Sequence, residues 1–319
     1  MKTDTKQYIT PNDKLKNNIE ALGYRQLLLE DEALFDKYYS MLDGHYSSNL
    51  CFLNLYCWED TLPTYFKEYE GFLVDICYDF MSGEIFVYPF MGKYTNEGIA
   101  KVFEMVRSDM EYLGVPYIIR DVSSWMRPYY EATGAEIEVI DLRQEMDYIF
   151  TPESFWAGMN TQDDRYRYKY FKRKNNYETV EITPDMVDEV TELMERVWCV
   201  KLGDCEECAY GCLKDVVVKL VKAFDKLNIQ GILVRVDGIA QGISIVSEKY
   251  KMGVYQYKNA ENKIKGINEY LLRECFERYM SGAEIINYTE DLGHENLRRY
   301  KEHMAPEFSL YSKLFLKVK

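Results

Sequence analysis

The sequence predicts an α/β (α+β) protein made of two tandem units, each a mixed, mostly antiparallel sheet flanked by helices. Three observations support this. An order of hairpin, helix and strand occurs twice, the length of 319 residues suits two domains, and hydrophobic residues at 47% with charged residues at 29% suit a globular chain. We expect one domain over residues 1–160 and a second over residues 161–319.

The first half contains a strand over residues 71–75, a turn at Ser82 and Gly83, and a second strand over 84–90. A helix follows, and then a strand over 117–121. The elements are short and separated by turn residues, which is typical of a sheet with flanking helices.

The second half repeats this order with other residues. A hairpin-rich stretch with the turn Asp237-Gly238 runs to Tyr257, a helix opens at 263–268, and a strand covers 284–288. Residues 308–318 alternate between apolar and polar and predict a closing strand.

Three helix starts share one signal. Thr10, Thr151 and Thr183 each precede a proline, so that a capping hydroxyl stands before a residue suited to the first helical position. After the third start, the apolar residues between Met186 and Trp198 share one helical face, which indicates packing in the core.

Charge and the N-terminus restrict the compartment and the partners. No run of about 18 apolar residues occurs, and the N-terminus lacks the apolar core of a secretory signal, so we expect a cytoplasmic protein without a membrane span. A net charge of −14 argues against wholesale binding of nucleic acid, because a polyphosphate is repelled at long range.

One local stretch is basic although the chain as a whole carries a negative net charge. The ten residues that begin at Arg165 and end at Lys174 contain six basic residues interleaved with four aromatics. Such a stretch can hold phosphates and stack bases, which makes tRNA a candidate partner. Alternatively, it forms a helix whose aromatics pack while its cations balance an acidic body.

The cysteines allow two interpretations. Cys199, Cys205, Cys208 and Cys212 have spacing that suits a tetrahedral zinc site. The last three would also share a face of one helix, where small thiols simply pack, and the chain has no second C-x₂-C pair. We predict no metal site.

The residues from Lys263 to Asn268 lie between a predicted strand and a predicted helix. Backbone N–H groups at such a start favour an anion, and a glycine lets a phosphate approach the main chain. This stretch resembles the pyrophosphate loop of the GNAT acyltransferases, with Gly266 in place and Lys263 where that family has Gln or Arg. The first half matches the loop at Gly98 and Ala100.

A further resemblance covers residues 286–301, which contain an Asn-x-x-Glu-Asp-Leu-Gly block followed by Leu-Arg and a lysine on the next helix. This pattern is similar to that of a bacterial family of uncharacterised proteins that share the C-terminal domain of phosphatidylglycerol lysyltransferases. The resemblance implies tandem GNAT-like domains, related to the Fem-type aminoacyltransferases, and a transferase activity. It implies acetyl-CoA, another acyl-CoA or aminoacyl-tRNA as the donor.

We therefore expect transfer of an acyl or aminoacyl group to an amine or hydroxyl acceptor. The chemistry should lie mainly in the second half, and the first half should form one wall of its substrate groove. The alternative is a non-catalytic ligand- or tRNA-binding protein that retains the fold. The candidate catalytic residues are Glu290, Asp291 and Tyr257; those for donor binding are Lys263, Lys265, Gly266, Ile267 and Asn268; those for substrate binding are Tyr255, Asn287, Arg298, Lys301 and Arg173.

These assignments rest on ordinary chemistry. A carboxylate at a strand end can accept the proton of an attacking amine. Arg298 and Lys301, three apart on a helix, can clamp an anion. The competing interpretation is that Glu290 or Asp291 only caps the helix that begins near His294, with Arg298 as its ion-pair partner.

Overall fold

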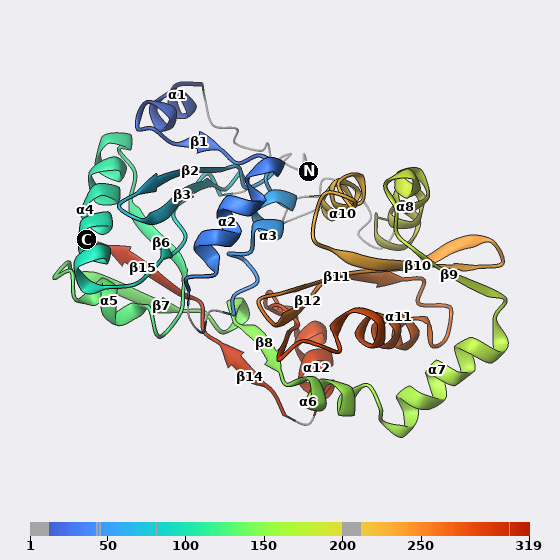
Figure 1. Ribbon diagram of the computed structural model, residues 1–319. Helices are drawn as coiled ribbons and strands as arrows, with labels where there is room; N and C mark the ends of the chain where they lie inside the picture. Colours follow the sequence, from blue (N-terminus) through green and yellow to red (C-terminus); the bar gives the residue numbers. More distant parts are fainter. Residues whose placement is uncertain (1–12, 43, 45, 81, 200–211, 306) are drawn as a thin grey trace, which may run out of the picture. The chain divides into compact units, whose positions relative to one another are not determined.

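The computed structural model describes residues 13–42, 44, 46–80, 82–199, 212–305 and 307–319 (Figure 1). The chain divides into two compact units, Met1–Met146 with Tyr311–Lys319, and Asp147–Leu310. The boundary expected between residues 160 and 161 thus lies inside the second unit, and the end of the chain belongs to the first.

The first unit is a sheet structure with helices. Its helices are α1 (Asp13–Ala21), α2 (Glu32–Tyr39), α3 (Phe52–Cys57), α4 (Asn96–Leu113) and α5 (Arg127–Glu131). Its strands are β1 (Arg25–Gln26), β2 (Thr64–Tyr69), β3 (Phe72–Tyr78), β4 (Ile85–Phe86), β5 (Met91–Gly92), β6 (Tyr117–Val122), β7 (Ile137–Asp141) and β15 (Leu314–Val318).

These strands form an antiparallel path β1-β2-β3-β4, with β5 also on β3, and an antiparallel group β6-β15-β7. A parallel bridge between Val87 and Ile119 connects the two groups. The predicted helix of this half is α4, where the Thr95 hydroxyl accepts from the Gly98 amide at 3.0 Å and Gly114 ends the helix with a φ of 70°.

The second unit is also built around a sheet. Its helices are α6 (Pro152–Gly158), α7 (Gln162–Lys174), α8 (Val187–Met194), α10 (Leu213–Lys222), α11 (Ile267–Cys275) and α12 (Glu295–His303), and π-helical turns follow α8 (Glu195–Cys199) and α11 (Phe276–Met280). Its strands are β8 (Asp147–Phe150), β9 (Tyr177–Glu181), β10 (Gln230–Val236), β11 (Ile239–Lys249), β12 (Met252–Ala260), β13 (Ile285–Asn287) and β14 (Ser309–Tyr311).

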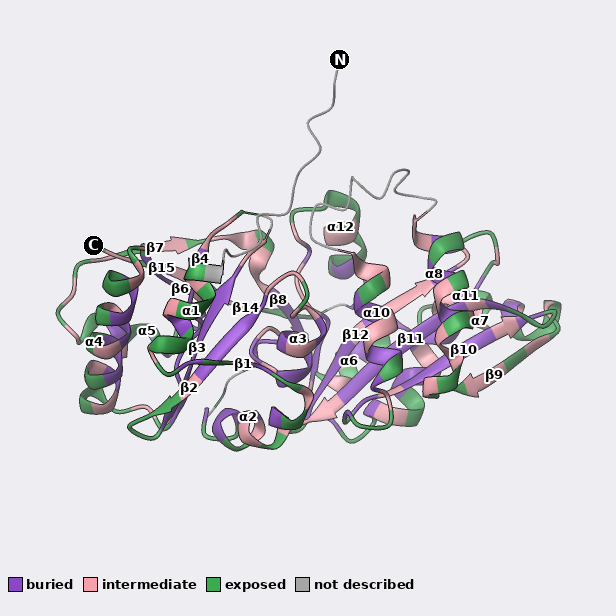
Figure 2. Cartoon of the chain, turned by 90° about the horizontal axis from the view of Figure 1, so that it is seen from above, coloured by how far each residue is buried: buried purple, intermediate pink, exposed green. Residues whose placement is uncertain are grey.

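Within the described residues, these seven strands have the order β14-β8-β13-β12-β11-β10-β9. In the described residues of this sheet, β12 and β13 pair in parallel, whereas β9 with β10, β10 with β11, β11 with β12 and β8 with β13 pair antiparallel. Figure 1 shows α8 and α10 on one face of the sheet and α11 on the other. The central strands β10 and β11 are buried along most of their length, as their purple colour in Figure 2 shows.

Each half of the sequence gives its last strand to the other unit. Strand β8, at the end of the first half, pairs with β13, and β15, at the end of the second half, lies between β6 and β7. The predicted single closing strand over 308–318 is therefore two strands in two sheets. The separation is stable because Leu314 and Leu316 are buried in the first unit.

Two of the three predicted helix starts can be compared with the structure. The Thr151 hydroxyl accepts from the Ser154 amide at 3.1 Å at the start of α6, as expected. Thr183 instead precedes a 3-10 turn over Pro184–Met186 that leads into α8, without a side-chain cap. Thr10 lies outside the described residues.

Candidate functional site

A β-bulge in β12 separates the two tyrosines that the sequence places side by side. Ile245 of β11 pairs with Tyr257, but the next residue, Val246, pairs with Tyr255, so one residue of β12 is extra. A bulge reverses which face the following side chains occupy. The Tyr255 hydroxyl therefore donates to the Leu272 carbonyl of α11 at 2.8 Å, whereas the Tyr257 hydroxyl lies 2.9 Å from the Met194 sulfur of α8.

Both phenols are protonated. Burial raises the pKa of Tyr255 well above its ordinary value, and burial likewise raises the pKa of Tyr257. A phenol in this state can donate a hydrogen bond but cannot serve as a base near neutral pH.

The loop that follows β13 has an unusual backbone. Pairing of β12 with β13 stops at Val254 and Asn287, and beyond this point Thr289 and Leu292 have φ values of 55° and 51°. Non-glycine residues rarely adopt this left-handed conformation, because it costs free energy that the surroundings must supply. The neighbouring side chains provide this stabilisation.

Asn287 fixes the start of the loop. Its amide nitrogen donates to the Asp147 carboxylate at 2.8 Å, and its oxygen accepts from the Thr289 backbone amide at 2.7 Å. Asn287 and Asp147 are both fully buried. Asn287 therefore binds the turn rather than facing solvent.

Asp291 fixes the other end of the loop. Its carboxylate is fully buried and accepts from the Tyr148 hydroxyl at 2.9 Å, the Gly293 amide at 2.9 Å and the Arg298 guanidinium at 3.0 and 3.1 Å. Burial opposes the charge, but the hydrogen bonds from Arg298, Gly293 and Tyr148 outweigh it and lower the pKa of Asp291 to about 2. The carboxylate is ionised at any ordinary pH and is a poor proton acceptor.

Lys301 of α12 completes the support from inside. It is 3% exposed, and its ammonium donates to the carbonyls of Tyr288 and Glu290 and to the Thr289 hydroxyl, the last two at 2.7 and 3.2 Å. A buried lysine is tolerated where oxygens surround its charge. Lys301 thus donates hydrogen bonds to three oxygens of the loop.

The structure brings Asn287, Asp291, Arg298 and Lys301 together around one loop, as the motif suggests. Their hydrogen bonds hold the loop itself in place. For Asp291 and Arg298, this agrees with the competing interpretation of the sequence, an ion pair beside the helix that follows the loop. Glu290 differs from them, because its side chain is half-buried at the surface of the same loop.

The backbone conformation and a close neighbour require glycine at position 266 of the predicted phosphate loop. Gly266 precedes α11 with a φ of 88°, and a Cβ atom there would lie 2.1 Å from the Arg167 carbonyl oxygen of α7. Helix α7 therefore covers this helix start, and the Arg167 guanidinium also lies 3.4 Å from Glu269 in the first turn of α11. Ile267 is fully buried beneath.

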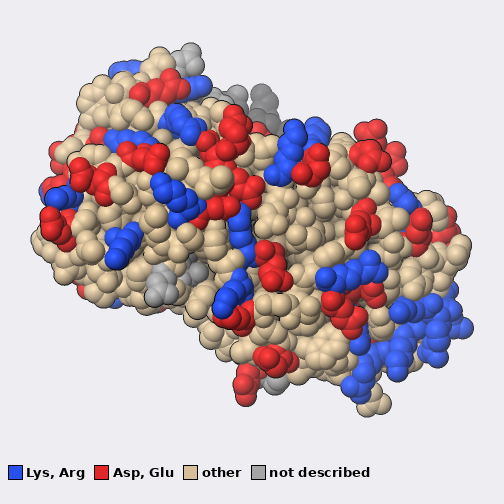
Figure 3. All heavy atoms as spheres, in the orientation of Figure 1, with Lys and Arg blue, Asp and Glu red and all other residues tan. Residues whose placement is uncertain are grey.

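One lysine of the same loop, Lys265, contacts helix α7. The Lys265 ammonium lies 4.8 Å and 5.1 Å from the ring centroids of Tyr166 and Tyr170. We name as the basic surface the exposed cations of this loop and of α7, apart from Arg167, which pairs with Asp163; Figure 3 shows basic side chains gathered over α7. The members of the basic surface are Arg165, Lys169, Lys172, Arg173, Lys174, Lys263 and Lys265. Asn268 lies apart from it and accepts from Lys258 at 3.3 Å.

Tyr148, like its neighbour Asp147, is a site residue that the sequence did not reveal. It stands 143 positions from Asp291, on a strand contributed by the first half of the chain. The only local signal is the apolar run before Thr151, which predicts a strand but not its neighbour.

Two absences concern only the described part of the chain. No group of three or more His, Cys, Asp or Glu side chains there could hold a metal ion; Cys205 and Cys208 lie outside it. Among the helices that the structure describes, none combines the length and the apolar character needed to cross a bilayer.

Comparison with known proteins agrees with this architecture. A family model described as phosphatidylglycerol lysyltransferase, C-terminal, matches residues 42–311. No curated protein matches the chain.

Solved structures with the same fold are distant in sequence. A conserved protein of unknown function from Bacteroides thetaiotaomicron has 20% identity and a TM-score of 0.80, with 93% of this chain and 99% of that chain covered. L-PGS from Bacillus licheniformis has 13% identity and a TM-score of 0.58, with 100% and 94% covered, and FemX has 9% and 0.63, with 93% and 97% covered.

At these identities the structural likeness concerns the fold alone, and it confirms the predicted mixed α+β class of antiparallel sheets flanked by helices. The family match spans most of the chain and includes the loop held by Asp291, Arg298 and Lys301. The chain belongs to the family of the phosphatidylglycerol lysyltransferase C-terminal domain.

Proposed function

We propose that this protein transfers an aminoacyl group from a tRNA donor to an amine or hydroxyl acceptor. The observation that supports this most is the basic surface, where seven exposed cations and two tyrosine rings lie together on a chain with a net charge of −14. Phosphates pair with such cations, and unpaired bases stack on such rings.

The start of α11 favours tRNA over coenzyme A as the donor. A pyrophosphate needs free backbone N–H groups and an open approach at the helix start. Here the Arg167 carbonyl occupies the space beside Gly266, and the carboxylate of Glu269 stands in the first turn. Both groups are unfavourable to an anion at that position.

In the proposed chemistry, the acceptor attacks the ester carbonyl of the aminoacyl-tRNA. A bond from the acceptor nitrogen or oxygen to that carbon forms, the ester bond breaks, and the ribose oxygen leaves with a proton. We assign acceptance of the attacking group's proton to Glu290, at the surface of the loop that Asp291 and Lys301 hold. A rigid loop suits this role, because a catalytic carboxylate must keep its position.

The proposal is tested by binding and by transfer. We expect tRNA to bind with an affinity that falls steeply with salt, and the triple variant Arg173→Gln, Lys263→Gln, Lys265→Gln to bind at least about tenfold more weakly. Lys251→Gln, which removes an exposed cation outside the basic surface, is the matched control. Binding that is independent of salt and of the triple variant would remove the support for tRNA.

Transfer is followed with radiolabelled lysyl-tRNA, chosen because of the family, and a panel of amines, alcohols and phosphatidylglycerol. We expect Glu290→Gln to lower the rate by about 10²-fold or more while tRNA binding is kept. If tRNA binds but no acceptor receives the label, the protein is the non-catalytic tRNA-binding alternative. If acetyl-CoA alone stabilises the protein to heat and Gly266→Trp abolishes the effect, the donor is coenzyme A.

A further inference from the structure

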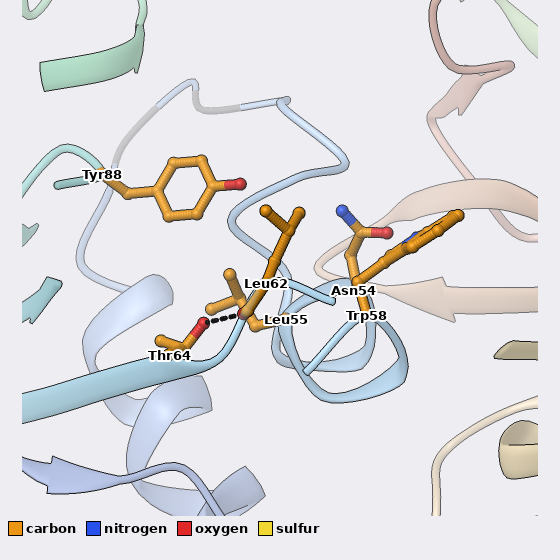
Figure 4. A pocket seen from close by; sticks show the side chains of 6 residues that line it. All are labelled: Asn54, Leu55, Trp58, Leu62, Thr64 and Tyr88. Atoms are coloured by element: carbon orange, nitrogen blue, oxygen red, sulfur yellow. Dashed lines mark hydrogen bonds between the residues drawn. The ribbon is translucent and has the colours of Figure 1, made fainter. Parts of the chain in front are cut away.

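Two polar regions outside the loop after β13 differ in charge. The pocket beside α3 in the first unit, shown in Figure 4, has room for little more than a water-sized group, and its polar side chains, among them Asn54, Thr64 and Tyr88, are uncharged. In the second unit, the ammonium of Lys258 stands on β12 next to α11 and α12. Of these two regions, the second presents a charge to a ligand.

The contacts of the Lys258 ammonium are with uncharged groups. It donates to the side-chain oxygen of Asn268 at 3.3 Å and lies 5.7 Å from the centroid of the Tyr300 ring. Lys258 is half-buried, yet within the described residues no carboxylate pairs with its ammonium. The carboxylate of Glu261, further along the chain, accepts from the Lys263 backbone amide at 3.0 Å. A half-buried ammonium without a counter-charge is a position that favours an anionic ligand.

An aromatic ring and two amides stand around this charge. Tyr300 of α12 is 44% exposed, which is unusual for a large aromatic side chain. The amide of Asn268 donates to the Asn262 side-chain oxygen at 3.2 Å, and Asn262 is exposed. A phosphate pairs with an ammonium, a base stacks on a ring, and amides exchange hydrogen bonds with hydroxyls and base edges. These three kinds of group together suit a nucleotide.

Asn268 separates this region from the covered start of α11. The Arg167 carbonyl lies beside Gly266, and the Arg167 guanidinium pairs with Glu269, so both of these residues of α11 lie toward α7. Asn268 instead turns to β12 through its hydrogen bond with Lys258. The two groups that oppose an anion at the helix start are therefore on the α7 side of α11, away from the side that Asn268 presents to β12.

Side-chain contacts connect this region with the two parts of the molecule that the proposed function uses. Asn262 directly precedes Lys263 of the basic surface. On the other side, the Tyr300 ring lies 6.4 Å from the ring of Tyr288, which opens the loop that carries Glu290. A ligand on this region would therefore extend from the basic surface toward that loop.

We propose that Lys258, Asn268 and Tyr300 bind the terminal nucleotide of the tRNA donor, with Lys258 on its phosphate and Tyr300 against its base. The inference rests on the proposed function, because it takes tRNA as the donor, and it adds the place where the reactive end binds. The aminoacyl ester is attached to the ribose of this nucleotide, so binding here brings the ester toward the loop that carries Glu290. A free nucleotide offers the same phosphate and base, and the experiment distinguishes the two sources.

The first measurement is the Kd of adenosine 5′-monophosphate and of adenosine, determined by calorimetry with the full chain. We expect Lys258→Gln to weaken binding of the monophosphate about tenfold or more and to leave adenosine unchanged. Tyr300→Leu should weaken both ligands about fivefold or more, whereas Tyr300→Phe, which keeps the ring, should bind both as the wild type does. Lys222→Gln, an exposed cation of α10, is the matched control and should leave both Kd values unchanged.

The second measurement compares intact tRNA with tRNA that lacks its terminal nucleotide. We expect the wild type to bind the shortened tRNA about tenfold more weakly, and Lys258→Gln to bind the two tRNAs equally, because the contact that the nucleotide makes is then already lost. If intact tRNA does not bind the wild type at all, the proposed function fails, and this is a different result from equal binding of the two tRNAs.

Three outcomes overturn the inference: no binding of the monophosphate, a Kd for it that Lys258→Gln does not change, or equal binding of the two tRNAs by the wild type. If the monophosphate binds through Lys258 but the shortened tRNA binds as well as the intact one, the region takes a free nucleotide and not the tRNA end. Should Lys258→Gln not fold, the contrast between Tyr300→Leu and Tyr300→Phe decides, and equal Kd values in these two variants refute the region as a nucleotide site.

Discussion

The two units contain the same backbone feature and surround it with different side chains. In each, a parallel strand contact is followed two residues later by a non-glycine residue in the left-handed region, Asp121 with a φ of 61° after Ile119 and Thr289 with 55° after Asn287. In the second unit the Lys301 ammonium fills the space beside this residue, whereas in the first the Asn49 amide binds Asp121. The two units thus share the backbone conformation after the strand, but different side chains contact the left-handed residue in each.

Two buried carboxyl groups, one in each unit, should make the stability of the protein depend on pH in opposite directions. Hydrogen bonds lower the pKa of Asp291 to about 2, so its contribution to stability is present above about pH 4 and is lost as the pH falls through about 2. Burial raises the pKa of Asp75 from 3.8 to about 7, so the folded state holds a proton that the unfolded state releases. Stability linked to Asp75 is therefore greatest below about pH 4 and decreases up to about pH 7, by as much as ~4 kcal/mol.

Urea unfolding of the wild type and of Asp75→Asn between pH 4 and pH 8 measures this effect. We expect the difference in unfolding free energy between the variant and the wild type to move in the variant's favour as the pH rises. Asp291→Asn should run parallel to the wild type over this range and should differ in its pH dependence only below about pH 4. Parallel pH profiles for the wild type and Asp75→Asn would mean that Asp75 is charged and already compensated.

The largest effect of a single change at fixed pH is expected at Asp291. Asp291→Ala leaves Arg298 and the Tyr148 hydroxyl without their partner and should cost about 3 kcal/mol, less than a completely buried pair because the Arg298 side chain is 30% exposed. The midpoint of urea unfolding measures it. Glu295→Ala, which breaks the exposed pair with Arg299, should change stability by less than about 0.5 kcal/mol. Equal effects of the two variants would contradict the framework role of Asp291.

The two glycines of the predicted phosphate loops should respond differently to alanine. Gly266→Ala places a Cβ atom 2.1 Å from a backbone oxygen at a positive φ and should cost about 2 kcal/mol. In Gly98→Ala the nearest atoms are the Thr95 hydroxyl oxygen at 2.9 Å and the Phe72 ring, and alanine is favoured in a helix, so the net change should stay within about 1 kcal/mol. Thermal unfolding of both variants tests this, and a neutral Gly266→Ala would show that α7 can move away from α11.

The smallest effect is expected on the basic surface. Lys265→Met removes a cation from the rings of Tyr166 and Tyr170, a contact that at an exposed site contributes about 0.5–1 kcal/mol. Stability should therefore change little, while binding of tRNA should weaken measurably at low salt. A large loss of stability would indicate that this lysine holds the loop to α7.

The sequence was sufficient for the cap of α6 and for the turn at Asp237 and Gly238. Asn287, Asp291, Arg298 and Lys301 meet around one loop because the four lie within fifteen residues on a strand, a loop and the next helix. Local spacing carries such information, since a helix repeats its face every three or four residues. The roles of these residues could not be predicted, because the spacing of residues along the chain does not determine their burial or their hydrogen-bond partners.

The amino-acid sequence by itself determined the class of fold and the family, because propensities, caps and a local motif are properties of neighbouring residues. Only the tertiary structure decided three other matters. The β-bulge placed Tyr255 and Tyr257 on opposite faces, the exchange of last strands brought Tyr148 to Asp291, and α7 covered Gly266 and joined its cations to Lys263 and Lys265. Each of these depends on contacts between distant segments, where packing and hydrogen-bond satisfaction select one arrangement from several that the local pattern allows.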